Sequence, residues 1–393
     1  MRLKYVDGLR AFAVLAVAMT HHQIYLIPSA FGVTLFFVIS GFVITRLLLK
    51  EHSIINGFRV KAFFARRALK IIPPFIVAIT IPTLLLWPSN NFDLAAILSQ
   101  HFFYYNWYQI THLEIAVSHS VNPAIVPGSQ VVWSLSVEEQ FYILIALLWF
   151  VLSKKVGAIR SLRATLLVAF LGSTIIRAVI ALSESFQRSE GNSVARIIWG
   201  TDTRLSGIAL GGLLAISASG AKPLFAKTNW MFDHISKNAR TYFVIGLSLI
   251  PFQYVMHKFT TTTFNDIVDL SLQEVAGFLL LATGLKANGW PNFILKITET
   301  KVVQRIGLAS YSIYLSHHIF SLYVLKRAPE GFTNLYSGGQ GVHLRDYVLI
   351  HICFALFTII PGLIIHQIAD APMEKYRKRW RVQSAEQQPS SAT

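Results

Sequence analysis

The chain has 393 residues, of which 53% are hydrophobic and 14% charged, and its mean hydropathy is +0.51. An average soluble domain carries about 25% charged residues, so this composition excludes an ordinary soluble enzyme and indicates an integral membrane protein. The net charge of +16 does not indicate a nucleic-acid partner, because its placement fits the positive-inside rule better. The one cysteine, Cys353, cannot form an intramolecular disulfide and indicates no Cys-based metal site or nucleophile.

The apolar stretches predict an all-α fold, a polytopic membrane protein with about ten transmembrane helices. No small-residue cleavage site follows the first stretch, so we interpret it as a retained span and not as a signal peptide. One membrane domain is expected over residues 1–381, followed by a polar, disordered cytoplasmic tail over 382–393. The predicted spans cover residues 9–27, 31–49, 70–88, 131–152, 162–183, 203–218, 241–257, 267–286, 305–325 and 346–368.

Basic residues decide the status of a further segment, 92–110, which is long enough to span but rich in polar and aromatic residues. No Lys or Arg occurs from 71 to 153, and four follow between 154 and 163. If 92–110 is re-entrant or interfacial, 25 of the 35 Lys and Arg residues lie in cytoplasmic segments; if it spans, the bias reverses. We therefore predict a re-entrant or interfacial segment, cytoplasmic termini, and a basic cytoplasmic connection over 50–69.

The first span carries an arginine and a histidine eleven residues apart, Arg10 and His21. Eleven residues advance a helix by about 16 Å and rotate it by roughly 20° beyond three full turns. The two side chains therefore share one face, and the charge bias places Arg10 near the cytoplasm and His21 in the outer half. Ionisable groups inside a span are costly and indicate a functional site.

Other polar groups within the spans fall into two levels under this topology. The outer level is predicted to gather His21, Glu138, Asp202, Arg204 and His317, with Trp133 in the same half of its span. The inner level is basic and is predicted to hold Arg10, Arg66, Arg67 and Lys70.

Each group also has a structural interpretation. A lone histidine in a span is often a hydrogen-bond partner between helices, which applies most to His317. In the structural interpretation of Glu138, its carboxylate is an ion-pair partner of Arg177 or Arg204. In that of the basic cluster, its cations set the membrane topology or contact anionic lipid head groups. Two pairs of adjacent histidines, His21 with His22 and His317 with His318, could suggest a metal site. We predict none, because adjacent side chains point apart on a helix.

Short motifs along nearly the whole chain resemble the acyltransferase 3 family, integral membrane enzymes that acylate carbohydrates and some other acceptors. The opening motif is similar to the family's Arg-x10-His pattern, with Arg10 and His21 in its positions. The most specific match is WSLSVEEQFY at 133–142, where Glu138 falls on the usual acidic position. The other matches, in family order, are FGVTLFFVISGFVIT (31–45), AFFARRALKIIP (62–73), TDTRLSGIALGGLLA (201–215), ASYSIYLSHHIF (309–320) and APMEKYRKRW (371–380).

The chain departs from the family pattern in three ways. Thr34 stands where the second-span signature usually has an acidic residue, which leaves the carboxylate partner of His21 open. Val131 and Val132 stand where a histidine often precedes the Trp-Ser-Leu run. Many members carry a fused extracytoplasmic hydrolase-like domain, which we do not expect here.

The resemblance implies that an acyl group, most often acetyl, moves from cytoplasmic acyl-CoA to a glycan hydroxyl at the inner (plasma) membrane. The acceptor would be extracytoplasmic or lipid-linked, such as O-antigen or exopolysaccharide. His21 would be the general base or carry the acyl group itself, and Glu138 would orient it or bind sugar hydroxyls. Acetyl-CoA phosphates need fixed cations, expected at Arg10, Arg66, Arg67 and Lys70. The acceptor is expected at Trp133, Asp202, Arg204 and His317.

Several alternatives stay open at this point. An acyl-enzyme route could run through Ser40 or Ser136, and the acceptor could be a macrolide hydroxyl. A proton-coupled transporter would also gather His, Glu, Asp and Arg at mid-depth, although the paired halves typical of transporters are not visible. A non-catalytic membrane scaffold is the third class. The expected partners are acyl-CoA, the acceptor and the lipid bilayer, without nucleic acid or metal.

Overall fold

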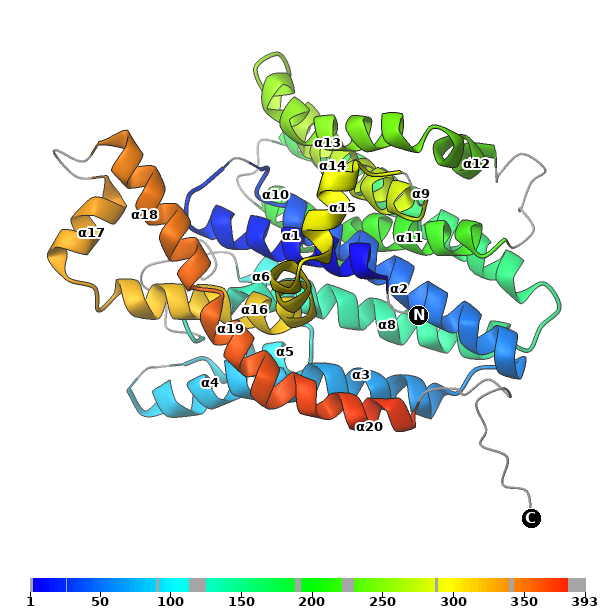
Figure 1. Ribbon diagram of the computed structural model, residues 1–393, viewed down its shortest axis with the longest axis horizontal. Coiled ribbons are helices and arrows are strands. Elements are labelled where there is room, and N and C mark those ends of the chain that lie inside the picture. The colour runs from blue at the N-terminus through cyan, green and yellow to red at the C-terminus, as the bar shows by residue number, and fades with distance from the viewer. Residues whose placement is uncertain are drawn as a thin grey trace.

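The computed structural model describes residues 3–25, 27–89, 92–112, 125–187, 192–220, 230–286, 289–338 and 343–380. These described residues form helices and connecting turns, which confirms the all-α prediction (Figure 1). The predicted tail over 382–393 lies outside them.

The helices follow one another along the chain with short connections. They are α1 (Lys4–His21), α2 (Phe31–Ile55), α3 (Val60–Phe75), α4 (Ile81–Leu86), α5 (Leu94–His101), α6 (Tyr105–Thr111), α8 (Val132–Leu152), α9 (Ala158–Gln187), α10 (Asn192–Trp199), α11 (Thr201–Ala218), α12 (Trp230–Lys237), α13 (Ala239–Met256), α14 (Thr262–Gly284), α15 (Asn292–Glu299), α16 (Lys301–Leu325), α17 (Glu330–Ser337), α18 (Leu344–Phe357), α19 (Ile360–Ile365) and α20 (Glu374–Arg379).

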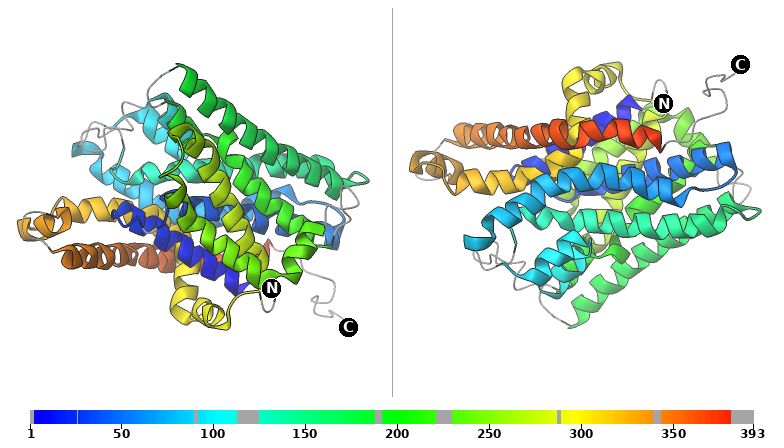
Figure 2. Two further views of the ribbon diagram at one scale, coloured as in Figure 1. Left: turned by 90° about the horizontal axis from the view of Figure 1, so that it is seen from above. Right: turned by 90° about the horizontal axis from the view of Figure 1, so that it is seen from below.

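Six segments of the described chain are long and apolar enough to cross a membrane. They are Phe31–Ile55, Val60–Leu86, Ser129–Leu152, Ala158–Ser183, Ile267–Gly284 and Arg345–Arg379. Helices α1, α11, α13 and α16 lie at four further predicted spans but are not among the six. Ten spans and cytoplasmic termini therefore stay predictions. The long helices run broadly side by side, whereas α15 is inclined steeply to them (Figure 2).

The basic segment 50–69 contains the end of α2, a short non-helical connection over 56–59 and the amphipathic start of α3. Helix α2 continues to Ile55, and α3 begins at Val60 because Ala62 and Phe63 extend its buried face. Prolines at 73 and 74 remove backbone donors, and the helix continues through a π-turn over 76–80 into α4. The helical segment long and apolar enough to span is thus Val60–Leu86, where residues 70–88 were predicted, and it carries the predicted basic cluster.

The segment 92–110 folds into two short helices, α5 and α6, joined by a turn. The amide of Gln140, near the middle of α8, donates to the carbonyl oxygen of Phe103 (2.8 Å) and to Oδ1 of Asn106 (2.9 Å). Asp93 caps α5, and the donated hydroxyl of Tyr108 lowers the pKa of its carboxyl. The turn between α5 and α6 therefore contacts the middle of α8, and the re-entrant or interfacial placement of 92–110 stays a prediction.

Helices α1 and α16 pack side by side and run in the same direction. A Cβ on Gly307 would meet the carbonyl oxygen of Asp7, and Arg10 Nε donates to Ser310 Oγ at 3.1 Å. Further along both helices, the ring of His21 stacks on the ring of His318. The face of α1 that carries Arg10 and His21 therefore lies along one face of α16.

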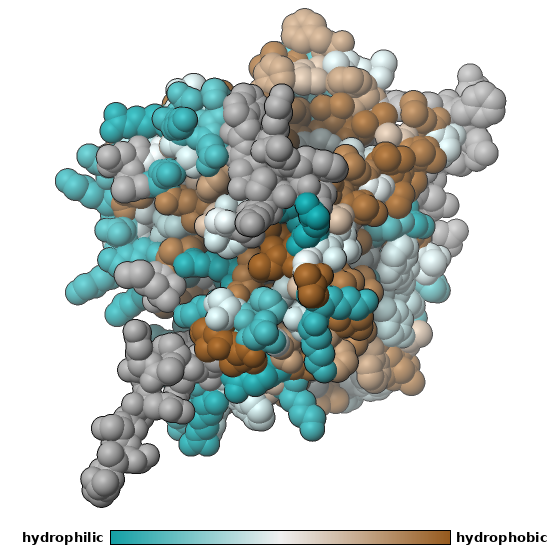
Figure 3. All heavy atoms as spheres, turned by 90° about the vertical axis from the view of Figure 1, so that its right-hand side faces the viewer, coloured by the Kyte–Doolittle hydropathy of each residue, from teal (hydrophilic) through white to brown (hydrophobic). Residues whose placement is uncertain are grey.

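Helix ends that the sequence assigns to the cytoplasm gather at one end of the bundle. The start of α1, the end of α2, the start of α3 and α20 all lie there (Figure 1). Figure 3 views this end and shows hydrophilic side chains beside apolar ones. Its exposed basic side chains include Lys50, Lys61, Lys154, Lys155, Arg160, Lys375, Lys378 and Arg379.

Two glycines allow a close helix contact between α2 and α11. A Cβ on Gly41 would lie 1.8 Å from the carbonyl oxygen of Ile208, and one on Gly211 would lie 1.9 Å from that of Val38. Close approach of this kind is how small residues drive helix association in membranes.

Gly211→Ala is expected to destabilise the protein by about 3 kcal/mol, because overpacking forces the two backbones apart. Gly172→Ala on α9 is the matched control, since nothing lies within 4 Å of its added Cβ. That control should be neutral or raise the melting temperature, because alanine favours helix interiors. Thermal unfolding in detergent measures both, and equal melting temperatures would contradict the prediction.

Candidate active site

A cavity of about 100 Å³ lies between α1, α2, α3, α8 and α16. Its apolar lining consists of Val33, Phe36, Phe37, Ile39, Val43, Ile71 and Leu135. The polar lining consists of Arg10, Ser40, Arg67, Lys70, Ser134, Glu138, Glu139, Tyr142, Ser310, Tyr311 and Tyr314. Five helices thus place cations, carboxylates and hydroxyls around one cavity.

Glu138 lies at the level of Arg10 in this cavity. Its carboxylate accepts hydrogen bonds from Ser40 Oγ (2.8 Å) and from the hydroxyl of Tyr142 (3.1 Å). The sequence placed Glu138 beside His21, but His21 is not part of the cavity lining. Helix α8 begins at Val132, so Glu138 lies almost two turns inside the helix.

The basic cluster divides into two groups. Arg66 donates to Glu51 Oε2 at 3.0 Å and to the carbonyl oxygen of Trp380 at 2.6 Å. Arg67 instead places its guanidinium 4.0 Å from the ring centroid of Tyr142 and lines the cavity. Arg66 therefore ties α3 to its neighbours, while Arg67 faces the space that a ligand would enter.

Lys70 also lines the cavity, and its ammonium is paired with Asp370 at 2.5 Å. The same carboxylate contacts Arg377 Nη1 and His366 Nδ1, each at 2.7 Å. Asp370 is fully buried, so three donors around it satisfy a charge that would otherwise be costly. Sequence reasoning missed Asp370; its signal was an isolated acid at the end of the last apolar run.

His21 lies at the opposite end of α1 from the cavity and is exposed. Its ring stacks on His318 with centroids 4.2 Å apart, and the centroid of His317 is 5.1 Å away. The predicted proximity of His21 and His317 is thus confirmed. His317 is fully buried, one helical turn beyond Tyr314 of the cavity lining.

Arg204 and Asp202 point to different surroundings although the sequence grouped them. Asp202 pairs with Arg196 of α10 at 2.5 Å. Arg204 is buried, donates to Thr34 Oγ1 at 3.1 Å, and has its guanidinium 5.8 Å from the ring centroid of Trp133. Thr34 stands where the second-span signature usually has an acidic residue. Its hydroxyl oxygen accepts a hydrogen bond from the Arg204 guanidinium, so this position forms no ion pair.

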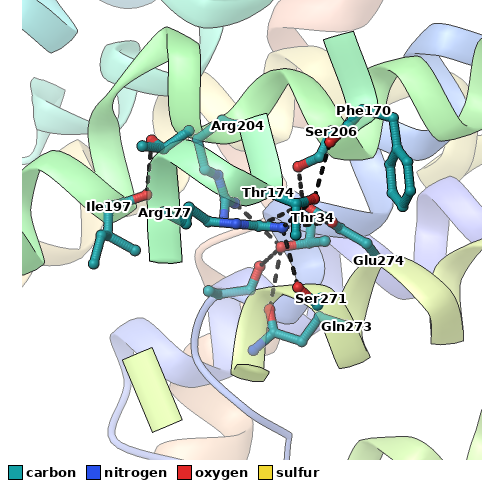
Figure 4. Close-up of polar contacts among 12 residues, drawn as sticks. Thr34, Phe170, Thr174, Arg177, Ile197, Arg204, Ser206, Ser271, Gln273 and Glu274 are labelled. Atoms are coloured by element: carbon teal, nitrogen blue, oxygen red, sulfur yellow. Dashed lines mark hydrogen bonds and ion pairs between the residues drawn. The ribbon is translucent and has the colours of Figure 1, made fainter. Parts of the chain in front are cut away.

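Glu274 of α14 is the acidic partner of Arg177, a role that one interpretation of the sequence gave to Glu138. The pair is bidentate, with Nη1 to Oε1 at 2.8 Å and Nη2 to Oε2 at 3.0 Å. Ser206 donates to the same carboxylate at 2.5 Å (Figure 4). Sequence reasoning did not single out Glu274, although it is an acid within a predicted span.

Metal coordination has no support in the described ranges, where no group of three or more His, Cys, Asp or Glu side chains could hold an ion. The arrangement can supply cations, a buried carboxylate and, at the other end of α1, two adjacent imidazoles.

Residues 3–367 match the model of a family described as an acyltransferase domain. The chain belongs to the acyltransferase 3 family. This acyltransferase is 27% identical over 379 residues to the O-acetyltransferase OatA of Staphylococcus aureus (strain NCTC 8325 / PS 47), covering 94% of the chain and 57% of that protein. It is 26% identical over 325 residues to the peptidoglycan O-acetyltransferase OatA of Listeria monocytogenes serovar 1/2a (strain ATCC BAA-679 / EGD-e), covering 80% and 48%.

The acyltransferase spans about half of the length of the curated relatives that it matches. No solved structure matches it. Family membership together with the apolar helices makes it a multi-pass membrane protein.

Proposed function

We propose that the protein is a membrane O-acyltransferase, and specifically an O-acetyltransferase, of the inner (plasma) membrane. It takes the acyl group from cytoplasmic acyl-CoA and delivers it to a hydroxyl of an extracytoplasmic or lipid-linked glycan. The observation that carries this proposal is the alignment of α1 with α16. Arg10 and Ser310 lie at the cavity, and His21 and His317 lie further along the same two helices.

We place the acyl-CoA donor in the cavity, from which its acyl group would extend along α1 toward His21. Coenzyme A phosphates favour forked, charge-assisted hydrogen bonds from arginine, and Arg10 and Arg67 present guanidinium groups there. Lys70 contributes less free charge because Asp370 pairs with it. Arg66 holds α3 in position through Glu51.

The acyl end of the path leads toward His21. An imidazole there acts as general base for the acceptor hydroxyl or carries the acyl group for one step. Glu138 belongs to the donor end, where it balances the charge of Arg10 and Arg67 and orders the polar wall through Ser40. Trp133 is the candidate surface for a sugar ring.

The proposal is tested with membranes that contain the protein and isotopically labelled acetyl-CoA. Mass spectrometry of the glycan fraction should find labelled acetyl esters, which are absent without the protein and removed by mild alkali. It also reads the acyl mass and the attachment site. Uptake of a solute without dependence on CoA, in place of esters, would contradict the proposed function.

Arg67→Ala is expected to weaken acetyl-CoA binding about tenfold, because a charge-assisted hydrogen bond contributes about 1.5–3 kcal/mol. Lys61→Ala is the matched control, since Lys61 lies on the same helix but is exposed and outside the cavity lining. The KM for acetyl-CoA in membranes with equal protein levels measures both. An unchanged KM for Arg67→Ala would argue that Arg67 only supports the packing of Tyr142.

A further inference from the structure

His317 carries its proton on a defined nitrogen. Its Nδ1 lies 3.1 Å from the carbonyl oxygen of Ile313 and 2.8 Å from that of Tyr314. A carbonyl oxygen can only accept, so Nδ1 must be the donor, and the Nε2 of the neutral ring is an acceptor. Full burial favours this neutral form, because a charged ring there would lose its hydration.

The acceptor nitrogen of His317 has no hydrogen-bond partner among the described residues. Buried polar atoms are nearly always paired, so an unpaired one calls for an explanation. A structural histidine between helices would use this nitrogen to hold a second helix. His317 instead satisfies one nitrogen within its own helix and leaves the other available.

The position of His317 gives that nitrogen a neighbour. Its ring centroid lies 5.1 Å from that of His21 on α1 and 5.9 Å from that of Tyr314, which lines the cavity. The ring of His21 also stacks on that of His318. At 5.1 Å between centroids, a ring rotation suffices to form an N–H···N bond, and such bonds are often long before substrate binds.

We propose that His317 is a positioning residue whose Nε2 accepts a hydrogen bond from the ring N–H of His21 during acyl transfer. The proposal rests on the proposed function and gives His21 the general-base role. The acceptor oxygen forms a bond to the acyl carbon while its proton moves to one nitrogen of His21. The N–H on the other nitrogen of His21 donates to Nε2 of His317, which fixes the tautomer and the ring orientation of His21. The thioester C–S bond breaks, its electron pair leaves with the CoA sulfur, and His21 gives the proton to that sulfur to complete the thiol.

The variant that isolates this role is His317→Asn. An asparagine amide can still donate to the carbonyl oxygens of the preceding turn, but it offers no basic nitrogen at the Nε2 position. His351 on α18 supplies a matched control with the same local geometry. It is 1% exposed, its Nδ1 lies 2.7 Å from the carbonyl oxygen of Tyr347, and its Nε2 has no partner in the described chain. It does not line the cavity.

The experiment measures initial rates of acetyl-ester formation against acetyl-CoA concentration in membranes with equal amounts of full-length variants. His317→Asn should lower kcat about 100-fold, because His21 loses the acceptor that fixes its tautomer and ring orientation, with KM for acetyl-CoA within about twofold. His351→Asn should keep kcat within about threefold. A His317→Asn enzyme with more than a third of the wild-type kcat, or an equal loss in His351→Asn, would overturn the role.

Two further measurements keep the result interpretable. Melting temperatures in detergent show whether His317→Asn is folded; if it is not, His317→Gln replaces it under the same criteria. His21→Ala is assayed in the same series. An inactive His21→Ala with an active His317→Asn overturns only the positioning role, whereas an active His21→Ala overturns the proposed mechanism at His21 and this role with it.

Discussion

Replacing His21 with alanine is expected to lower acyl transfer by at least 100-fold while acetyl-CoA binding is kept. The expected loss follows from the removal of the general base or acyl carrier, which contributes about 10²–10⁴-fold in enzymes of known mechanism. Binding should survive because the cavity lining includes Arg10 and Arg67 but not His21. The rate of ester formation and the KM for acetyl-CoA, measured in membranes, separate the two effects.

The control for this substitution is His343→Ala. His343 is also an exposed histidine, at the start of α18, and does not line the cavity. Its replacement should leave the rate within about twofold, as is usual for an exposed site. Retained activity in His21→Ala would refute the catalytic assignment, and a large increase in KM would move His21 to the donor site.

Glu274→Gln is expected to destabilise the protein by about 3–5 kcal/mol, because it leaves the guanidinium of Arg177 buried without its charge partner. Arg177 is fully buried and Glu274 is 2% exposed. Ser206 and Ser271 also bond to this pair, so the substitution disturbs three helices together (Figure 4). Thermal unfolding in detergent and the yield of folded protein measure the effect.

Glu299→Gln is the comparison for that change. Glu299 pairs with Lys4 at 3.8 Å, and both side chains are more than half exposed. Exposed ion pairs contribute at most about 1 kcal/mol to stability, so this variant should have nearly the same melting temperature as the wild type. The double variant Arg177→Met, Glu274→Leu should recover much of the loss, because it removes both buried charges. A Glu274→Gln protein as stable as the wild type would contradict the account.

Features that depend on the geometry of a single helix could be predicted from the sequence. The eleven-residue spacing of Arg10 and His21 places both side chains on one face of a helix. The proximity of His317 to His21 followed because the charge bias assigned the same direction to both spans. Hydropathy likewise located the apolar runs, although the amphipathic start of α3 was too basic to be included in its span.

Pairings between distant helices could not be predicted in the same way. Hydropathy gives the depth of a residue but not the direction in which its helix face points. Glu274 meets Arg177 across 97 positions, and Lys70 meets Asp370 across 300. The sequence therefore named Glu138 as the acidic partner, since it was the acid with a recognised motif.

The contact between α3 and the last helical segment has a consequence for biogenesis. Lys70 is held by Asp370, and Arg66 donates to the backbone of Trp380, close to the end of the described chain. A ribosome has to synthesise 300 residues beyond Lys70 before Asp370 becomes available. The cation-lined cavity therefore takes its final shape only after the segment with Asp370 is inserted, and chains that stall before it would lack an ordered donor site.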